Sequence, residues 1–240
     1  MKSKKKLIVL LFLVFLIVCK CSNFVESFDN KWMKNLTFSN TMKWGKYEWS
    51  AADNLGRTNQ NILKKLPVIP FPTNTSDQTR AELDDLIKKQ KELTKEQIKN
   101  IEKEQEWEPT IKQFNPKVDE RKKLDDYIFD KVQPLHLTLK RHFDRVRPSF
   151  LEGKLRPPID VPHHASYPSG HSTECWSVAF CLADKYPERK EKYYAIANNI
   201  ATNRERAGLH YKSDSDYGRL LAKKILDLVA SENHPLLGKY

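Results

Sequence analysis

Three short blocks of the sequence carry residue types that could act together on a phosphate group. The blocks run from Lys140 to Arg147-Pro148, over Pro168-Ser169-Gly170-His171, and through Arg204, His210 and Asp214. Fixed cations hold phosphate oxygens, a helix N-terminus presents unpaired N–H groups to an anion, and histidines transfer protons or attack. We therefore expect the three blocks to converge on one site that removes a phosphate group.

The first block could place two cations on one side of a helix. Lys140 and Arg147 are seven residues apart, and at about 100° per residue seven steps return to within roughly 20° of the same face. Arg147 can bind two oxygens in a bidentate fork, whereas Lys140 offers a compact point charge. Pro148 disfavours helix at Arg147 and predicts that the element ends there. Taken alone, the block is also typical of a basic helix surface.

The second block predicts the start of a buried helix. Ser169 is a suitable N-cap, Gly170 lets backbone approach a ligand closely, and a largely apolar stretch follows them. The first N–H groups of such a helix are unpaired and favour an anion, beside which His171 would project. The alternative for this block alone is a capped helix with an incidental exposed histidine.

The third block combines a histidine with a carboxylate. His210 and Asp214 are spaced i, i+4, so on a helical turn the carboxylate can reach the imidazole. A carboxylate that accepts a proton from one ring nitrogen fixes the tautomer and leaves the other nitrogen free to attack. Arg204 adds a third cation. A surface His–Asp pair is the ordinary alternative.

Together the blocks resemble a known signature. The pattern Lys-x6-Arg-Pro, Pro-Ser-Gly-His and Arg-x5-His-x3-Asp, across residues 140–218, resembles that of the type-2 phosphatidic acid phosphatase superfamily. The chain looks most like its soluble bacterial class A nonspecific acid phosphatases, which are related to vanadium-dependent haloperoxidases. Asn203 departs from the pattern, because the family usually has Ser there. We expect Asn203 to hydrogen-bond a phosphate oxygen in its place.

The resemblance implies a role for each residue. His210 would be the nucleophile that forms a phosphohistidine, Asp214 would orient it, and His171 would protonate the leaving oxygen. The phosphate-binding residues that it implies are Lys140, Arg147, Ser169, Gly170 and Arg204. No metal and no cofactor are expected, because cations and a helix N-terminus can supply the charge stabilisation that phosphoryl transfer needs.

The rest of the chain predicts an all-α fold, a single-domain helical bundle of the acid phosphatase/vanadium haloperoxidase type. Strand alternation is scarce and Gly is low. A helix is predicted to start near Ser76 or Asp77, and Thr94-Lys-Glu-Gln97 is a capping box for a second helix. An apolar stretch leads towards Pro134, and a new helix is predicted to carry Lys140. Further amphipathic helices are predicted over 190–203 and 215–230.

The domain boundaries follow from composition. Residues 1–22 are predicted to be a signal peptide or an N-terminal anchor, because four lysines precede an apolar run of 13 residues, Leu7–Cys19. Residues 23–77 are predicted to be an irregular N-terminal arm, and 78–240 a helical phosphatase domain. The expected location is secreted or periplasmic, with anchoring to a membrane through the N-terminus as the alternative.

The charge and the cysteine content of the chain limit the partners that can be expected. The formal net charge of +11 includes five leader lysines, so +6 would remain without them. This surplus can attract small phosphomonoester substrates. No nucleic-acid motif is present, so no nucleic acid is expected, whereas membrane contact through the N-terminus and a homo-oligomer are left open. Cys175 and Cys181 are six residues apart in one predicted helix and are not expected to pair.

The expected function is that of an acid phosphatase that hydrolyses phosphate monoesters through a phosphohistidine, without a metal. Three alternatives are kept: a lipid phosphate phosphatase acting at a membrane surface, a vanadium-dependent haloperoxidase, and a non-catalytic phosphate-binding protein. Residues 24–240 contain no long apolar span, which disfavours a multi-span lipid phosphatase. A protein that only binds phosphate would not need a general acid aligned with a nucleophile, which disfavours the non-catalytic alternative.

Overall fold

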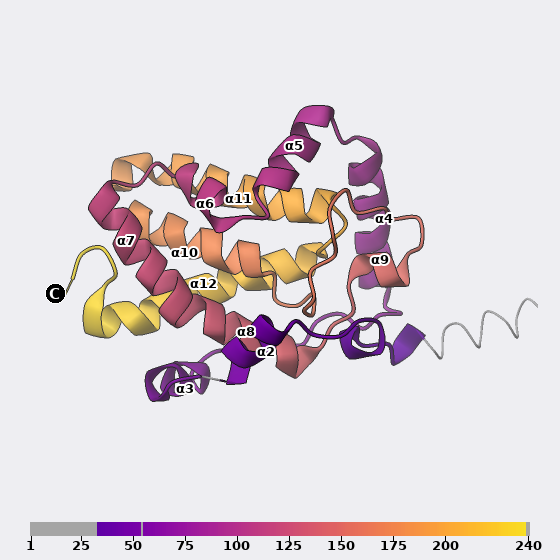
Figure 1. Ribbon diagram of the computed structural model, residues 1–240, viewed down its shortest axis with the longest axis horizontal. Helices are drawn as coiled ribbons and strands as arrows, with labels where there is room; N and C mark the ends of the chain where they lie inside the picture. The colour runs from indigo at the N-terminus through magenta and orange to yellow at the C-terminus, as the bar shows by residue number, and fades with distance from the viewer. Residues whose placement is uncertain (1–32, 54, 239–240) are drawn as a thin grey trace, which may run out of the picture.

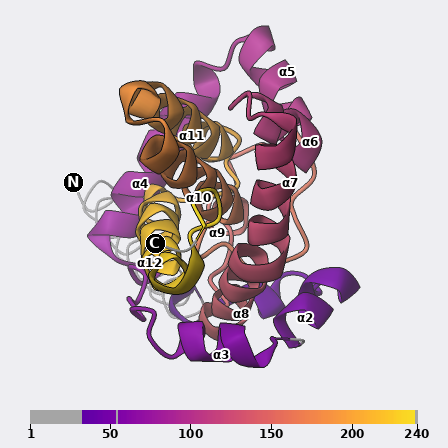
Figure 2. The same ribbon diagram turned by 90° about the vertical axis from the view of Figure 1, so that its left-hand side faces the viewer.

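Helix α10 (Gly170–Lys185) lies at the centre of the fold. The computed structural model describes residues 33–53 and 55–238, so the predicted leader lies outside the described residues. Helices α11 (Lys190–Arg206) and α12 (Lys212–Asn233) pack along α10, and α8 (Gln133–Phe143) packs against another side of it (Figures 1 and 2). Because its sequence is apolar on nearly every face, α10 can be enclosed in this way.

A long helical rod lies across the central helices. It consists of α7 (Val118–Tyr127), a π-helical turn η2 (Ile128–Val132) and α8, with no break between them. The predicted helix that carries Lys140 is therefore present as α8, but it begins at Gln133 and continues the π-helical turn without a break. Pro134 is in the first turn of α8, and the wider π-turn before it accommodates a residue that lacks an N–H and crowds the preceding carbonyl.

Three further helices lie beside this bundle: α4 (Asp77–Lys91), α5 (Lys95–Lys103) and α6 (Trp107–Lys112). The Ser76 hydroxyl accepts a hydrogen bond from the Thr79 N–H at 3.2 Å and starts α4. Thr94 and Gln97 form the predicted reciprocal capping box of α5. Both predicted helix starts are thus confirmed. Leu83 and Leu86 of α4 are buried against the loop that follows α9 (Pro148–Leu151).

The N-terminal arm differs from its prediction. The described part of 23–77 includes a 3-10 turn, η1 (Phe38–Asn40), and the short helices α2 (Lys46–Asp53) and α3 (Arg57–Leu63). Proline is absent from 46–63, and Gly56 precedes α3 as its N-cap, so nothing in this stretch prevents helix. Both helices pack against α8, which explains why they are stable outside the main bundle.

The all-α prediction is confirmed. Residues 33–53 and 55–238 contain helices and isolated bridges but no β-strand. None of the helices described in this range combines the length and apolar character that crossing a membrane requires. Cys175 and Cys181 do not pair with each other, as predicted, and both are buried.

Candidate active site

Lys140 and Arg147 come together through a sharp turn. Helix α8 ends at Phe143, and Asp144 follows in a left-handed conformation with φ 47°. Arg147 then caps the short helix α9, with Pro148 as its first residue. The prediction of one helix face shared by Lys140 and Arg147 is wrong, because Asp tolerates the left-handed conformation and Pro suits a helix start.

Both cations are nevertheless buried side by side beneath the same loop. The Lys140 ammonium donates to the carbonyls of Ala165, at 2.7 Å, and Ser166, at 3.1 Å. Arg147 Nε donates to the His164 carbonyl at 3.0 Å, and its Nη1 donates to the Leu209 carbonyl at 2.9 Å. Burial lowers the pKa of both groups, and the Arg147 charge lowers that of Lys140 further. The Lys140 ammonium group and the Arg147 guanidinium group thus lie under one loop.

The predicted helix start at Ser169 is confirmed. Its hydroxyl accepts from the Ser172 N–H at 3.3 Å, and its own N–H donates to the Asp214 carbonyl at 3.0 Å. This second bond ties the second sequence block to the third. Gly170 packs closely against His136, and a Cβ there would lie 3.1 Å from His136 Cε1, so a larger residue would press on that side chain.

His210 and Asp214 are brought into contact at the start of α12. His210 Nδ1 lies 3.2 Å from Asp214 Oδ2, which also accepts from the Tyr211 N–H at 3.0 Å. When Nδ1 carries the ring proton and donates it in a hydrogen bond to Asp214, the free lone pair is on Nε2, which lies 3.4 Å from Arg147 Nη1. Burial holds the pKa of His210 well below its usual value, so the ring is neutral at pH 7.

Arg145 is a residue of the site that the sequence did not indicate. The Arg145 side chain is fully buried, its Nη1 lies 2.6 Å from Asp214 Oδ1, and its guanidinium covers the Tyr211 ring at 3.7 Å. Burial raises the pKa of Asp214, but Arg145 and then His210 outweigh it and hold that pKa far below the usual range. No local signal separates Arg145 from Arg141, because only the turn at Asp144 sends it inward.

His171 and Arg204 form a second group. His171 Nε2 donates to the Glu104 carbonyl at 2.7 Å, and Arg204 Nη1 lies 3.4 Å from the same ring nitrogen. Arg204 Nη2 donates to the Ile101 carbonyl at 3.0 Å. Burial, followed by the Arg204 charge, lowers the pKa of His171 to about 4. An anion placed between the two side chains would raise that pKa again.

Asn203 does not have the role expected of it. Its amide donates to both carboxylate oxygens of Glu104, at 3.2 and 3.0 Å, and its carbonyl oxygen accepts from Arg206 at 2.8 Å. Glu104 is itself buried, and burial raises the pKa of its carboxyl. Asn203 therefore positions the loop after α5 rather than facing a phosphate. Glu104 lies far from Asn203 in the sequence, and nothing in the local sequence around either residue predicts their contact.

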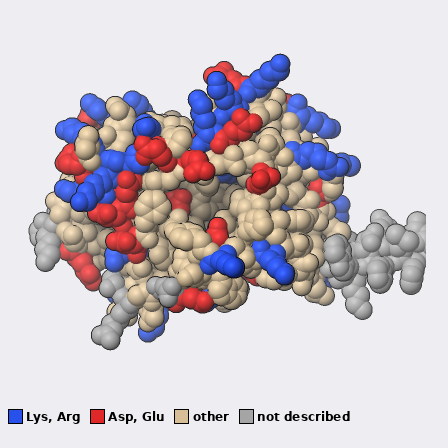
Figure 3. Space-filling view, viewed as in Figure 1, with Lys and Arg blue, Asp and Glu red and all other residues tan. Residues whose placement is uncertain are grey.

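One cavity joins the two groups. It has a volume of about 620 Å³, and its walls include Gly170, His171, Arg204 and His210. His163 and His164, from the loop before Ser169, also line it. The remaining predicted site residues lie behind this wall rather than on it: Lys140, Arg147, Ser169 and Asp214. Figure 3 shows a hollow near the centre of this face.

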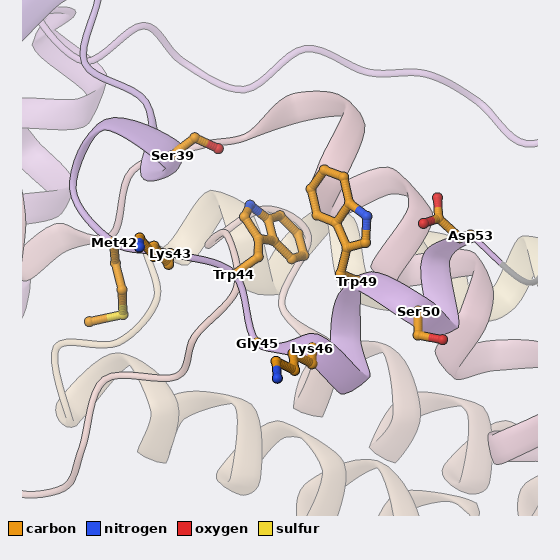
Figure 4. Close-up of a pocket in the computed structure, with 9 residues that line it drawn as sticks. All are labelled: Ser39, Met42, Lys43, Trp44, Gly45, Lys46, Trp49, Ser50 and Asp53. Atoms are coloured by element: carbon orange, nitrogen blue, oxygen red, sulfur yellow. The ribbon is translucent and has the colours of Figure 1, made fainter.

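A second cavity, of about 640 Å³, lies on the N-terminal arm (Figure 4). Trp44 and Trp49 form its aromatic wall with ring centroids 5.9 Å apart, and Arg141 covers the Trp49 ring at 4.8 Å. None of the predicted site residues lines it. Trp44 also packs edge-on to the buried Phe38 at 5.8 Å, in agreement with a packing role for the aromatic residues of the arm.

The donor set of the site suits an anion. Across the described ranges, no group of three or more His, Cys, Asp or Glu side chains is arranged to hold a metal ion. The groups that converge are instead guanidinium, ammonium and imidazole side chains with a helix N-terminus, which bind phosphate oxygens.

Comparison with known proteins agrees with this geometry. A non-specific acid phosphatase of Providencia stuartii is 29% identical over 87 residues, which cover 35% of this chain and 35% of that relative. The match therefore spans about a third of the relative's length. The crystal structure of the first bacterial vanadium-dependent iodoperoxidase superposes with a TM-score of 0.57 at 13% identity. It covers 72% of this chain and 54% of that one, and at this identity it shows the fold alone.

The family model described as the PAP2 superfamily matches residues 131–226. This range contains all eight predicted site residues, from Lys140 to Asp214. The fold and the site geometry agree with this match, and the similarity to the PAP2 superfamily lies within residues 131–226.

Proposed function

We propose that this protein is an acid phosphatase that hydrolyses phosphate monoesters through a phosphohistidine intermediate, without a metal ion. The observation that carries the proposal is the state of His210. Its Nδ1 faces Asp214, its Nε2 lies beside Arg147, and burial keeps the ring neutral. A neutral imidazole with a free nitrogen next to a fixed cation is suited to attack phosphorus. The similarity to an acid phosphatase supports the same conclusion.

The first chemical step would be an in-line displacement. His210 Nε2 forms a bond to phosphorus while the bond from phosphorus to the ester oxygen breaks. Arg204, which lines the cavity, would bind the equatorial oxygens together with the N–H groups at the start of α10, and Lys140 and Arg147 would add positive charge from behind the cavity wall. Asp214 stabilises the positive charge that develops on the His210 ring.

His171 would supply the proton that the leaving oxygen takes. Its low pKa in the free protein reflects burial and the Arg204 charge. A bound phosphate dianion opposes that charge and raises the pKa, so that a proton is present when the ester bond breaks. In the second step neutral His171 would accept a proton from water, the water oxygen would bond to phosphorus, and the bond to His210 Nε2 would break.

The direct test is phosphate release from p-nitrophenyl phosphate by the purified chain in the presence of EDTA. We expect activity that persists in EDTA, is inhibited by vanadate, and is lost in His210→Ala. His142→Ala is the matched control, because His142 is exposed on α8 and lies outside the cavity. Loss of activity in EDTA that added metal restores would reject metal independence, and full activity of His210→Ala would reject the nucleophile.

Location is a separate proposal. We propose that residues 1–22 direct the protein to a secreted or periplasmic location, with retention as a membrane anchor as the alternative. The charged start and the apolar run of 13 residues support it. Mass spectrometry of the mature N-terminus distinguishes the two, because cleavage removes the apolar run and anchoring retains it.

A further inference from the structure

The cavity that holds His171 and His210 has an acidic mouth, although the chain is basic overall. Four carboxylate side chains line it, and Arg204 is the one Lys or Arg among its lining residues in the described part of the chain. Figure 3 shows acidic side chains gathered around the hollow. A pocket that served only to attract phosphate would be expected to carry the opposite charge at its entrance. The carboxylates at the entrance are therefore suited to a part of the ligand other than its phosphate group.

Three of these carboxylates are unpaired and come from separate segments. Glu48 belongs to α2, Glu106 follows α5, and Asp160 lies in the loop after α9. Within the described ranges, none of the three side chains has a hydrogen-bond or ion-pair partner. Glu48 is turned over Gly45, where any side chain would collide with its carboxylate. All three line the same cavity, so a cation bound there would be attracted by carboxylates from three segments.

Aromatic rings form another part of the same wall. Trp107 and Phe129 meet edge to face with centroids 5.8 Å apart, and both line the cavity together with Tyr47. Phe129 is 41% exposed and Tyr47 is 64% exposed, so these apolar faces are available to a ligand. Aromatic faces beside carboxylates are the chemistry that recognises ammonium groups, particularly alkylated ones.

Two buried polar atoms show that the inner part of the cavity is also built for a ligand. Arg204 is 2% exposed and its Nε has no partner in the described chain. His136 is 3% exposed, and its Nδ1 likewise has none among the described residues, while its Nε2 lies 2.9 Å from Glu174. Both side chains line the cavity. Unsatisfied buried polar atoms are costly, and a bound polar molecule would satisfy them.

We propose that the substrates are phosphate monoesters of alcohols that carry an ammonium group, with the chemistry of phosphocholine or phosphoethanolamine. This rests on the proposed function. The phosphate would lie between His171, His210 and Arg204, and the ammonium group would face the carboxylates and the aromatic rings at the mouth. A volume of about 620 Å³ accommodates a molecule of this size. The same acidic mouth disfavours substrates with a second phosphate group.

The test compares phosphocholine with 3,3-dimethylbutyl phosphate, which has the same shape but carbon in place of the charged nitrogen. Each is incubated with the full chain at low ionic strength, and phosphate release gives kcat/KM. We expect kcat/KM to be about tenfold higher for phosphocholine, which is the effect expected of one ammonium group beside aromatic and acidic side chains. The ratio of the two kcat/KM values should fall with added salt. Equal values for the two esters would overturn the inference.

Variants of the lining residues test which side chains cause the preference for phosphocholine over the neutral ester. In the triple variant Glu48→Gln, Glu106→Gln, Asp160→Asn the ratio should fall towards one, and in Phe129→Leu it should fall in part. The matched control is Glu188→Gln, an acid with 64% side-chain exposure that is not part of the cavity wall; its ratio should be that of the parent. A ratio that survives the triple variant would overturn the inference.

Activity on the neutral ester separates the two proposals. Hydrolysis of 3,3-dimethylbutyl phosphate without preference for phosphocholine rejects the ammonium site but leaves the phosphatase. Hydrolysis of neither ester, nor of p-nitrophenyl phosphate, rejects the proposed function and this inference with it.

Discussion

Arg145 and Asp214 form a buried ion pair, with Nη1 2.6 Å from Oδ1, through the carboxylate oxygen that does not contact His210. Each oxygen of Asp214 thus faces a different group, so the carboxylate is held from both sides. Glu82 contacts Arg145 at 3.5 Å and accepts from the Ser213 N–H at 2.8 Å, which extends the chain of charges to α4. We infer that Arg145 positions Asp214 and keeps it ionised.

The first prediction concerns this ion pair. Arg145→Lys keeps a positive charge but loses the planar fork, so we expect kcat/KM to fall about tenfold, or about 1.4 kcal/mol. Because Arg145 lowers the pKa of Asp214, that pKa should rise, and the low-pH limb of kcat/KM should move to higher pH. Arg145→Met leaves a buried carboxylate unpaired and should destabilise the fold by about 3–5 kcal/mol.

Arg141→Lys is the matched control for this prediction, since Arg141 is in the same segment but pairs with the partly exposed Asp53. It should change neither the rate nor the pH profile. An unchanged pH profile in Arg145→Lys would show that Arg145 stabilises the fold without acting on Asp214.

The second prediction tests His171 as the acid. p-Nitrophenolate leaves without a proton, whereas an alkoxide needs one. His171→Ala should therefore reduce kcat for an alkyl phosphate by about 10²–10⁴-fold and reduce kcat for p-nitrophenyl phosphate much less. Steady-state rates with both substrates give the comparison. An equal loss on the two substrates would assign His171 to binding rather than to proton transfer.

The third prediction concerns stability and pH. Burial lowers the pKa of His136, His164, His171 and His210, with His171 at about 4. In the unfolded chain these groups titrate near about 6.5, so between the two values the unfolded state binds more protons. The free energy of unfolding should therefore be largest above about pH 6.5 and fall below it, by at most about 1.4 kcal/mol per pH unit for each histidine.

Urea unfolding at pH 7.5, 6.0 and 5.0 measures this loss. Inorganic phosphate should reduce the loss, because an anion in the site raises the pKa of His171 in the folded state. Glu104 acts in the opposite direction, since its raised pKa adds stability as the pH falls, but it is one group against four. A free energy that stays constant over this range would contradict the burial of neutral histidines.

The fourth prediction concerns the position where the family usually has Ser. Asn203→Ser should not raise activity, because the Asn203 amide donates to Glu104 rather than to a phosphate. It should destabilise the protein by about 1–3 kcal/mol, since the buried Glu104 carboxylate loses donors. Thermal unfolding and kcat/KM measure the two effects. Higher activity in Asn203→Ser, with unchanged stability, would contradict the arrangement in the structure.

The sequence predicted the site better than it predicted the path of the chain. The Ser169 cap and the contact between His210 and Asp214 follow from local spacing, and local spacing can be read from a sequence. The turn at Asp144 and the contacts of Arg145 depend on residues from α4 and α12. Likewise, Asn203 meets Glu104 across the fold. Such contacts between distant segments have no signature in local sequence, and for that reason Arg145 and Glu104 were missed.

The most direct test of the central claim is to trap the phosphoenzyme. The chain is mixed with a labelled phosphate monoester, quenched in alkali within one turnover, and digested at alkaline pH. The proposal predicts label that is lost in acid, located on the peptide that contains His210, and absent from His210→Ala. Label on any other residue, or turnover in His210→Ala equal to that of the parent, would contradict it.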